Sequence, residues 1–348
     1  MNSQLKTAGF SLLLFLAAIA AAPPKYSLGT DWRTVSVWTY ETGRVPSLLA
    51  QLHDPGRWDV AFWTDPYFSD NALRWRLLLP AVGHILHLPA PAYLGLPWVG
   101  LFGLLWISVH YLRRAGLADG GLLAAGILVG TSAAFFCAAN SIGMMDPFYL
   151  IALVVFTFSP SNLPALGACL LGPWIDEKFL LVLPLCALVR WGREPSWAWV
   201  RWAVLGISPY CLVRLVAWGA GDSGVARQLA MQQAVLGDYL PQLPWGWLFG
   251  FRCGWLMVGL GVGSAFLALR RGTRWLLPAA LLAGTAALGL LAFDTTKSIA
   301  ALLPLLLVGA AHPRAKPWLP AMAALNLLLP AGYYVNAHPT LILIGWWS

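Results

Sequence analysis

The chain has 348 residues, of which 59% are hydrophobic and only 10% are charged, and its mean hydropathy is +0.68. This composition argues against a soluble domain and is typical of a polytopic membrane protein. The net charge of +8 does not indicate nucleic-acid binding, because the basic residues form short clusters between apolar segments without a basic-aromatic recognition motif. The five cysteines show no CxxC or Cys/His spacing, so neither a disulfide framework nor a zinc site is indicated.

Apolar runs bounded by charges, glycine and proline predict an all-α bundle of about eleven membrane helices in a single domain over residues 1–348. Several runs are shorter than the ~20 residues that cross a bilayer, which predicts tilted or broken helices inside the bundle. The first run is either a cleaved signal peptide or a short membrane helix. The runs lie near residues 8–22, 92–112, 120–139, 147–159, 161–173, 178–190, 198–218, 245–269, 275–292, 298–311 and 318–334.

Basic residues predict the orientation of the bundle, since short cytoplasmic loops carry an excess of Lys and Arg. Of the 14 acidic residues only Asp119 and Glu194 fall in the basic loops, so the opposite, extracytoplasmic side receives the others. We therefore expect an integral protein of a bacterial-type inner or plasma membrane. The basic residues that fall on every second loop are Arg113, Arg114, Arg190, Arg193, Arg201, Arg270, Arg271, Arg274, Arg314 and Lys316.

Two extracytoplasmic segments are predicted. Residues 23–91 form a long first loop, in which residues 34–52 and 70–87 have the apolar pattern of amphipathic helices that lie on a membrane surface. Residues 219–244 form a second outer segment.

Three consecutive charges interrupt the apolar stretch GPWIDEKFLLVLP at Asp176, Glu177 and Lys178. A charge at the centre of a bilayer costs roughly 2.5–3.5 kcal/mol on insertion scales. The loop alternation places these residues at the outer mouth of a helix pair instead. The same outer level collects Asp31, Asp146, Arg252, Asp294 and Lys297.

Lys178 and Lys297 are isolated cations at the outer ends of apolar helices, where the positive-inside rule disfavours them. Either neighbouring acids neutralise them, or they form a phosphate-binding pair. Arg252 either adds a bidentate contact to the same phosphate or extends its side chain to the membrane interface.

Asp31, in GTDWRT, is either an N-cap of the following helix or a general base in a cleft at the membrane surface. Arg74 and Arg76 are two residues apart and cannot share one helix face, so one of them is able to point into that cleft. Asp65 precedes a proline in a turn context. The acids of this loop lack a DxD spacing, and we predict neither a metal nor another cofactor.

The pattern resembles the glycosyltransferase C superfamily, polytopic enzymes that take a sugar from a polyprenyl-phosphate donor at the outer face of a membrane. The resemblance lies in Asp31 at the start of the first outer loop, and in the segments RWRLLLPAVGHILHLP (74–89), MDPF (145–148), IDEKFLLVLP (175–184) and FDTTKSIAALLP (293–304).

The resemblance implies an inverting transfer, in which Asp31 takes a proton from the acceptor hydroxyl. The leaving phosphate then develops its charge against Lys178, Lys297 or Arg252. The expected partners are a polyprenyl-phosphate-linked sugar, membrane lipids and an acceptor that the sequence does not specify, with no nucleic acid. Residues that bind or orient the substrates would be Asp65, Arg76, Asp146, Asp176, Glu177 and Asp294.

Two other classes remain open. A transporter or flippase for a lipid-linked or small polar solute also has broken helices and outer charges, but it is expected to place ionisable residues near mid-membrane and to show inverted halves. A membrane subunit without catalytic activity in an envelope-assembly complex is the other class.

Overall fold

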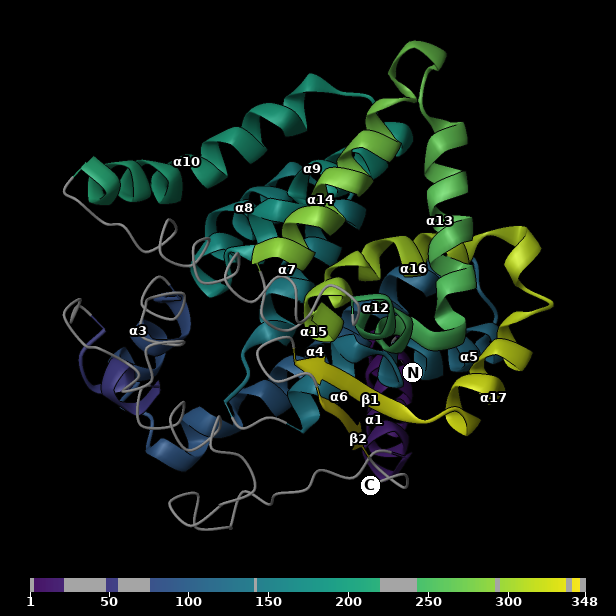
Figure 1. Ribbon diagram of the computed structural model, residues 1–348, viewed down its shortest axis with the longest axis horizontal. Coiled ribbons are helices and arrows are strands. Elements are labelled where there is room, and N and C mark those ends of the chain that lie inside the picture. Colours follow the sequence, from purple (N-terminus) through teal and green to yellow (C-terminus); the bar gives the residue numbers. More distant parts are fainter. Residues whose placement is uncertain are drawn as a thin grey trace.

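The computed structural model describes residues 3–21, 48–55, 76–140, 143–219, 243–291, 295–335 and 340–344. Helices make up most of this part of the chain (Figure 1). In the first half they are α1 (Ser3–Ala21), α3 (Leu78–Ile85), α4 (Ala90–Arg114), α5 (Asp119–Gly130), α6 (Ala133–Ala139), α7 (Asp146–Phe158), α8 (Asn162–Ile175), α9 (Lys178–Arg193) and α10 (Trp197–Gly219). In the second half the elements are α12 (Leu243–Phe251), α13 (Trp255–Ala268), α14 (Leu276–Leu291), α15 (Thr295–Ile299), α16 (Leu303–Ala311), α17 (Leu319–Leu328) and the strands β1 (Ala331–Val335) and β2 (Thr340–Ile344).

Three stretches of the described residues are long and apolar enough to cross a membrane: α4, residues 197–216 of α10, and α12 together with α13. The pair α5 and α6 makes a fourth if its 53° bend is counted within one span. This agrees with an integral membrane protein but gives fewer full-length spans than the eleven predicted runs. Five further apolar helices have 10–17 residues, in keeping with the expectation of short segments.

Helix breaks explain part of this difference. The predicted run 120–139 is interrupted between α5 and α6, where the Thr131 hydroxyl donates to the Ile127 carbonyl at 2.6 Å and the Ser132 hydroxyl to the Val129 carbonyl at 2.7 Å. Both carbonyls also accept a backbone N–H, from Thr131 and Ser132 respectively, so the hydroxyls add second hydrogen bonds to the last turn of α5. Such back-bonding of Ser and Thr often accompanies a bend in a helix. The run 298–311 is likewise divided by a 3₁₀ turn, after which Pro304 stands in the first turn of α16.

The C-terminal region also departs from the prediction, because α17 ends at Leu328 and not at residue 334. Leu329 has an extended backbone before Pro330, as proline requires of the residue that precedes it. The next residues form β1, which pairs in antiparallel fashion with β2 from Ala331 opposite Ile344 to Val335 opposite Thr340. Tyrosine, valine, leucine and isoleucine dominate these strands, and most of these residue types favour pleated backbone.

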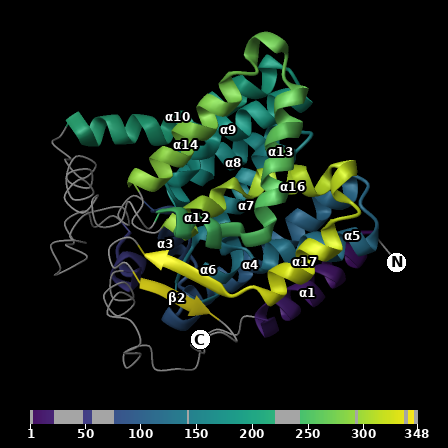
Figure 2. The ribbon, with the colours of Figure 1, turned by 45° about the vertical axis from the view of Figure 1, so that its right-hand side comes forward.

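Helix α7 is the centre of the bundle. It contacts α4, α6, α8, α9 and α16, and Tyr149, Leu153 and Phe156 on it are fully buried. α10 packs against α8 and projects from the bundle in both views (Figures 1 and 2).

The helices α13 and α16 approach closely at Gly261 and Gly309, where an added Cβ would overlap a carbonyl of the facing helix. Such small-residue contacts are typical of helix pairs in membranes.

The two ends of α7 carry opposite charges. Asp146 lies in its first turn, and the last-turn carbonyls of Phe156 and Thr157 accept hydrogen bonds from Arg190 at 2.5 Å and Arg193 at 3.0 Å. Both arrangements complement the helix dipole. A helix of 13 residues is about 20 Å long, so two sets of charges that the sequence assigns to opposite membrane sides lie at opposite ends of one buried helix.

Candidate functional site

At the N-terminal end of α7, the carboxylate of Asp146 lies between two lysines from distant parts of the chain. The Lys178 Nζ atom is 3.4 Å from Oδ1, and the Lys297 Nζ atom is 3.5 Å from Oδ2. All three side chains are nearly buried, with exposed fractions of 11% for Lys178, 7% for Lys297 and 6% for Asp146. The carboxylate thus holds both ammonium groups on opposite sides of itself.

Asp176 extends this arrangement from the turn between α8 and α9. Its Oδ1 accepts the backbone N–H of Lys178 at 2.9 Å, a local bond that starts α9 and fixes the lysine's position. Its Oδ2 lies 2.9 Å from an Arg76 guanidinium nitrogen and 3.9 Å from the Lys178 Nζ. Arg76, Asp176, Lys178, Asp146 and Lys297 therefore form one continuous set of ion pairs, which we call the charge network.

The charge network contains three cations and two carboxylates. Burying ions away from water costs several kcal/mol each unless opposite charges and hydrogen bonds compensate. Asp176 is only 2% exposed, so solvent screens the network little at its centre, whereas Arg76 at its edge is 20% exposed. Two of the three cations, Lys178 and Lys297, meet at one carboxylate, and two ammonium groups held together in this way are able to bind one phosphate.

Glu177, between the two residues that enter the network, has separate partners. The Tyr210 hydroxyl donates to its carboxylate at 2.8 Å, and an Arg214 guanidinium nitrogen lies 3.4 Å away. This carboxylate has its own guanidinium partner, and it also interacts electrostatically with Arg76 at the edge of the network. The sequence analysis missed Tyr210 and Arg214, although an arginine inside the apolar run 198–218 is itself a signal of a buried polar contact.

Arg252, predicted to join the two lysines at a phosphate, binds other groups. Its guanidinium donates to the carbonyls of Asn326 and Leu329, both at 2.7 Å, and to that of Thr131 at the bend between α5 and α6. Its backbone has φ of 50°, in the left-handed region. Among the described contacts none links Arg252 to the charge network, and we do not count it among the anion-binding cations below.

Five predicted site residues therefore meet in one network, although they are up to 221 positions apart in the chain. Asp31, Asp65 and Asp294 lie outside the described residues, as does the outer segment from 220 to 242. Of the two predicted amphipathic stretches, residues 48–52 and 78–85 are helical in the described part.

A small cavity adjoins the network at Arg76. It has a volume of about 20 Å³, is also lined by Tyr93 and Ile175, and has room for about one water molecule. In the described ranges no group of three or more His, Cys, Asp or Glu side chains is arranged to hold a metal ion. No protein-family model, curated protein or solved structure matches the chain. The functional argument therefore rests on the chemistry of the network.

The first prediction concerns Asp146. We expect Asp146→Asn to lower the free energy of unfolding by about 3–5 kcal/mol, because both lysines then lose a buried counter-ion. Adding Lys297→Met should recover part of the loss, since it removes one of the two cations that Asp146 binds. The measurement is thermal and chemical unfolding of the purified protein in detergent.

Asp119→Asn is the matched control for Asp146→Asn. Asp119 pairs with Arg113 at 3.1 Å, but its side chain is 84% exposed, so the substitution should change stability by no more than about 1 kcal/mol. Equal losses of unfolding free energy in the two variants would show that the shared, buried carboxylate stabilises the protein no more than an exposed one.

Proposed function

We propose that the protein is a membrane glycosyltransferase that moves a sugar from a polyprenyl-phosphate donor to an acceptor on the extracytoplasmic face. The observation that carries the proposal is the charge network, in which two nearly buried lysines from distant parts of the chain share one aspartate. A lipid phosphate is an anion that charge-assisted hydrogen bonds from two such lysines are able to hold at the end of a membrane bundle.

In the proposed reaction, the donor phosphate binds against Lys178 and Lys297. Asp31 takes the proton of an acceptor hydroxyl, the acceptor oxygen bonds to the anomeric carbon, and the bond from that carbon to the phosphate oxygen breaks. The phosphate keeps the electron pair, and the two lysines stabilise the negative charge that it develops. A single displacement of this kind inverts the anomeric configuration. The proposal requires no metal or other cofactor.

Chain connectivity supports a role for the first outer loop in the same site. The polypeptide that carries Asp31 and Asp65 runs on to Arg76, which is attached to Asp176 by a 2.9 Å ion pair. We propose that Asp65 and Asp294 orient the sugar or the cations, as Asp176 and Asp146 orient Arg76, Lys178 and Lys297.

A transporter or flippase is the second candidate, and one observation favours it. α5 and α6 form a helix pair bent by 53°, and the buried Arg252 donates to the Thr131 carbonyl at the bend. Discontinuous helices of this kind line the substrate sites of many transporters. Reconstituted protein separates the two candidates, because a transferase forms a new glycosidic bond whereas a transporter changes only the location of the solute.

Orientation is part of the proposal. We place the charge network at the extracytoplasmic side and the arginine-rich end of α7 at the cytoplasmic side, with the shorter apolar helices completing an eleven-helix bundle within the membrane. Asp54 follows a helical stretch of the first outer loop and is exposed, whereas Gly272 is exposed between the basic residues 271 and 274.

The second prediction tests this orientation. In a cysteine-free background, a membrane-impermeant thiol reagent added to intact cells should label Asp54→Cys, and it should label Gly272→Cys only after the membrane is opened. Labelling of both positions from outside, or from inside, would contradict the proposed topology.

The third prediction concerns Asp31. An asparagine at this position keeps the size and most of the capping capacity, so a simple helix cap would lose no more than about 1 kcal/mol of stability. A general base would lose its proton acceptor, which typically contributes about 10²–10⁴-fold to the rate. We expect Asp31→Asn to fold normally, to bind the donor, and to transfer sugar at least about a hundredfold more slowly in single turnovers.

Asp54→Asn, in the same loop, is the matched control for Asp31→Asn and should retain the wild-type rate. If Asp31→Asn also turned over at the wild-type rate with saturating donor, Asp31 would be a cap and the base would lie elsewhere.

A further inference from the structure

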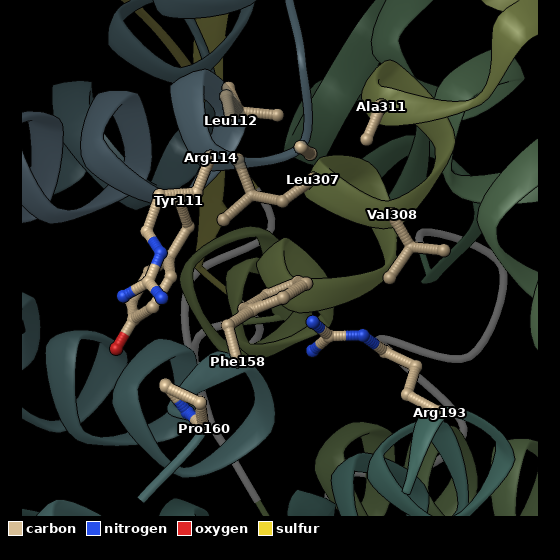
Figure 3. A pocket seen from close by; sticks show the side chains of 10 residues that line it. Tyr111, Leu112, Arg114, Phe158, Pro160, Arg193, Leu307, Val308 and Ala311 are labelled. Atoms are coloured by element: carbon tan, nitrogen blue, oxygen red, sulfur yellow. The ribbon is translucent and has the colours of Figure 1, made fainter.

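A second polar site lies at the opposite end of α7. A partly open cavity of about 330 Å³ is lined by residues at the C-terminal ends of four helices, α4, α7, α9 and α16 (Figure 3). This volume lies in the range of roughly 300–1,000 Å³ that small-molecule sites occupy. Because α7 is about 20 Å long, the cavity is remote from the charge network.

One side of the cavity is cationic and aromatic. Arg193 lies with its guanidinium 5.0 Å from the centre of the Phe158 ring, and the Tyr111 ring is 5.6 Å from the same ring. Figure 3 shows the Arg193 guanidinium directed toward Phe158, with Tyr111 and Arg114 on the other side of that ring. The two arginines therefore come from different helices and flank one aromatic surface.

The opposite wall is apolar and is provided by Leu307, Val308 and Ala311 of α16, with Leu112 of α4. The cavity thus has the two parts of an amphiphile's binding site, a cationic rim and a hydrocarbon wall. Such basic pockets between membrane helices bind lipid head groups.

The arginines retain binding capacity. Arg193 donates one hydrogen bond, to the Thr157 carbonyl at 3.0 Å, which leaves further N–H groups without an acceptor among the described residues. Arg114 has no carboxylate partner in the described part of the chain, and none of the described residues that line the cavity is acidic. Glu194, next in sequence to Arg193, forms its ion pair with Arg190 at 3.7 Å and interacts with Arg193 only at longer range.

The negative ends of four helix dipoles point toward the cavity and disfavour an anion, so an anion binds there only if nearby cations offset this effect. At α7 it is offset, because Arg190 and Arg193 donate to its last-turn carbonyls and so neutralise that end. Basic residues also lie in the last turns of α4 and α9, which include Arg114 and Arg193. The cavity is therefore lined by two guanidinium groups and, among the described residues, by no carboxylate.

From this geometry we infer that the cavity binds one anionic phospholipid, with its phosphate between Arg114 and Arg193 and the first part of an acyl chain against Leu307 and Val308. The two guanidinium groups select an anionic over a zwitterionic head group, and the apolar wall selects a lipid over free phosphate. The inference does not depend on the transferase proposal, because it uses no residue of the charge network.

Native mass spectrometry of the detergent-purified protein, titrated with phosphatidylglycerol or phosphatidylcholine, tests the inference. We expect phosphatidylglycerol to bind at least about tenfold more tightly, since each Arg near an anionic lipid contributes about 1 kcal/mol, or about fivefold. The double variant Arg114→Gln/Arg193→Gln should lose this preference. Val308→Phe, which keeps both arginines but reduces the cavity, should weaken binding of both lipids.

Arg270→Gln/Arg271→Gln is the matched control, because these arginines are exposed and do not line the cavity. The control should keep the preference, and millimolar inorganic phosphate should not displace the lipid. Persistence of the preference in the Arg114/Arg193 variant, an equal loss in the control, an unchanged affinity in Val308→Phe, or full competition by phosphate would each overturn the inference.

Discussion

The shared carboxylate of Asp146 is the contact on which the rest of the structure at this end of the bundle depends. It lies in the first turn of the central helix α7 and binds two nearly buried cations, Lys178 of α9 and Lys297 of α15. Asp176 continues the arrangement by starting α9 and binding Arg76. One continuous set of ion pairs thereby determines how the ends of several helices meet.

The same principle explains the opposite end of α7, where arginines satisfy the last-turn carbonyls. The central helix thus has an acidic residue at its positive end and cations at its negative end, the combination that stabilises a helix dipole. Each end of α7 also gathers cations from distant parts of the chain, Lys178 and Lys297 at one end and Arg114 and Arg193 beside the cavity at the other. We propose an anion site at each end, of different chemistry and about 20 Å apart.

Sequence patterns predicted the helices well where apolar runs end at charges or prolines, as at Asp146, Lys178 and Arg114. The outer charges were predicted to share one level because the loop alternation fixes which helix end each occupies. A hydropathy pattern does not indicate which carboxylate a lysine contacts. The ion pairs of Asp146 could therefore be identified only from the three-dimensional structure. Arg252 was predicted as a phosphate ligand because its partners, carbonyl groups at the ends of helices, cannot be recognised in an apolar sequence. The C-terminal strands were missed because their residues are as apolar as a helix run.

We propose, as the central claim, that Lys178 and Lys297 of the charge network bind a lipid phosphate. Its most direct test is the affinity of the purified protein for a short-chain polyprenyl phosphate, compared between the wild type, Lys178→Met and, as a control, the exposed Lys316→Met. Lys178→Met leaves the described network with two cations and two carboxylates, and we predict a loss of at least about tenfold in affinity, as expected when one charge-assisted hydrogen bond of about 1.5–3 kcal/mol is removed. An unchanged affinity in Lys178→Met, or an equal loss in Lys316→Met, would contradict the account.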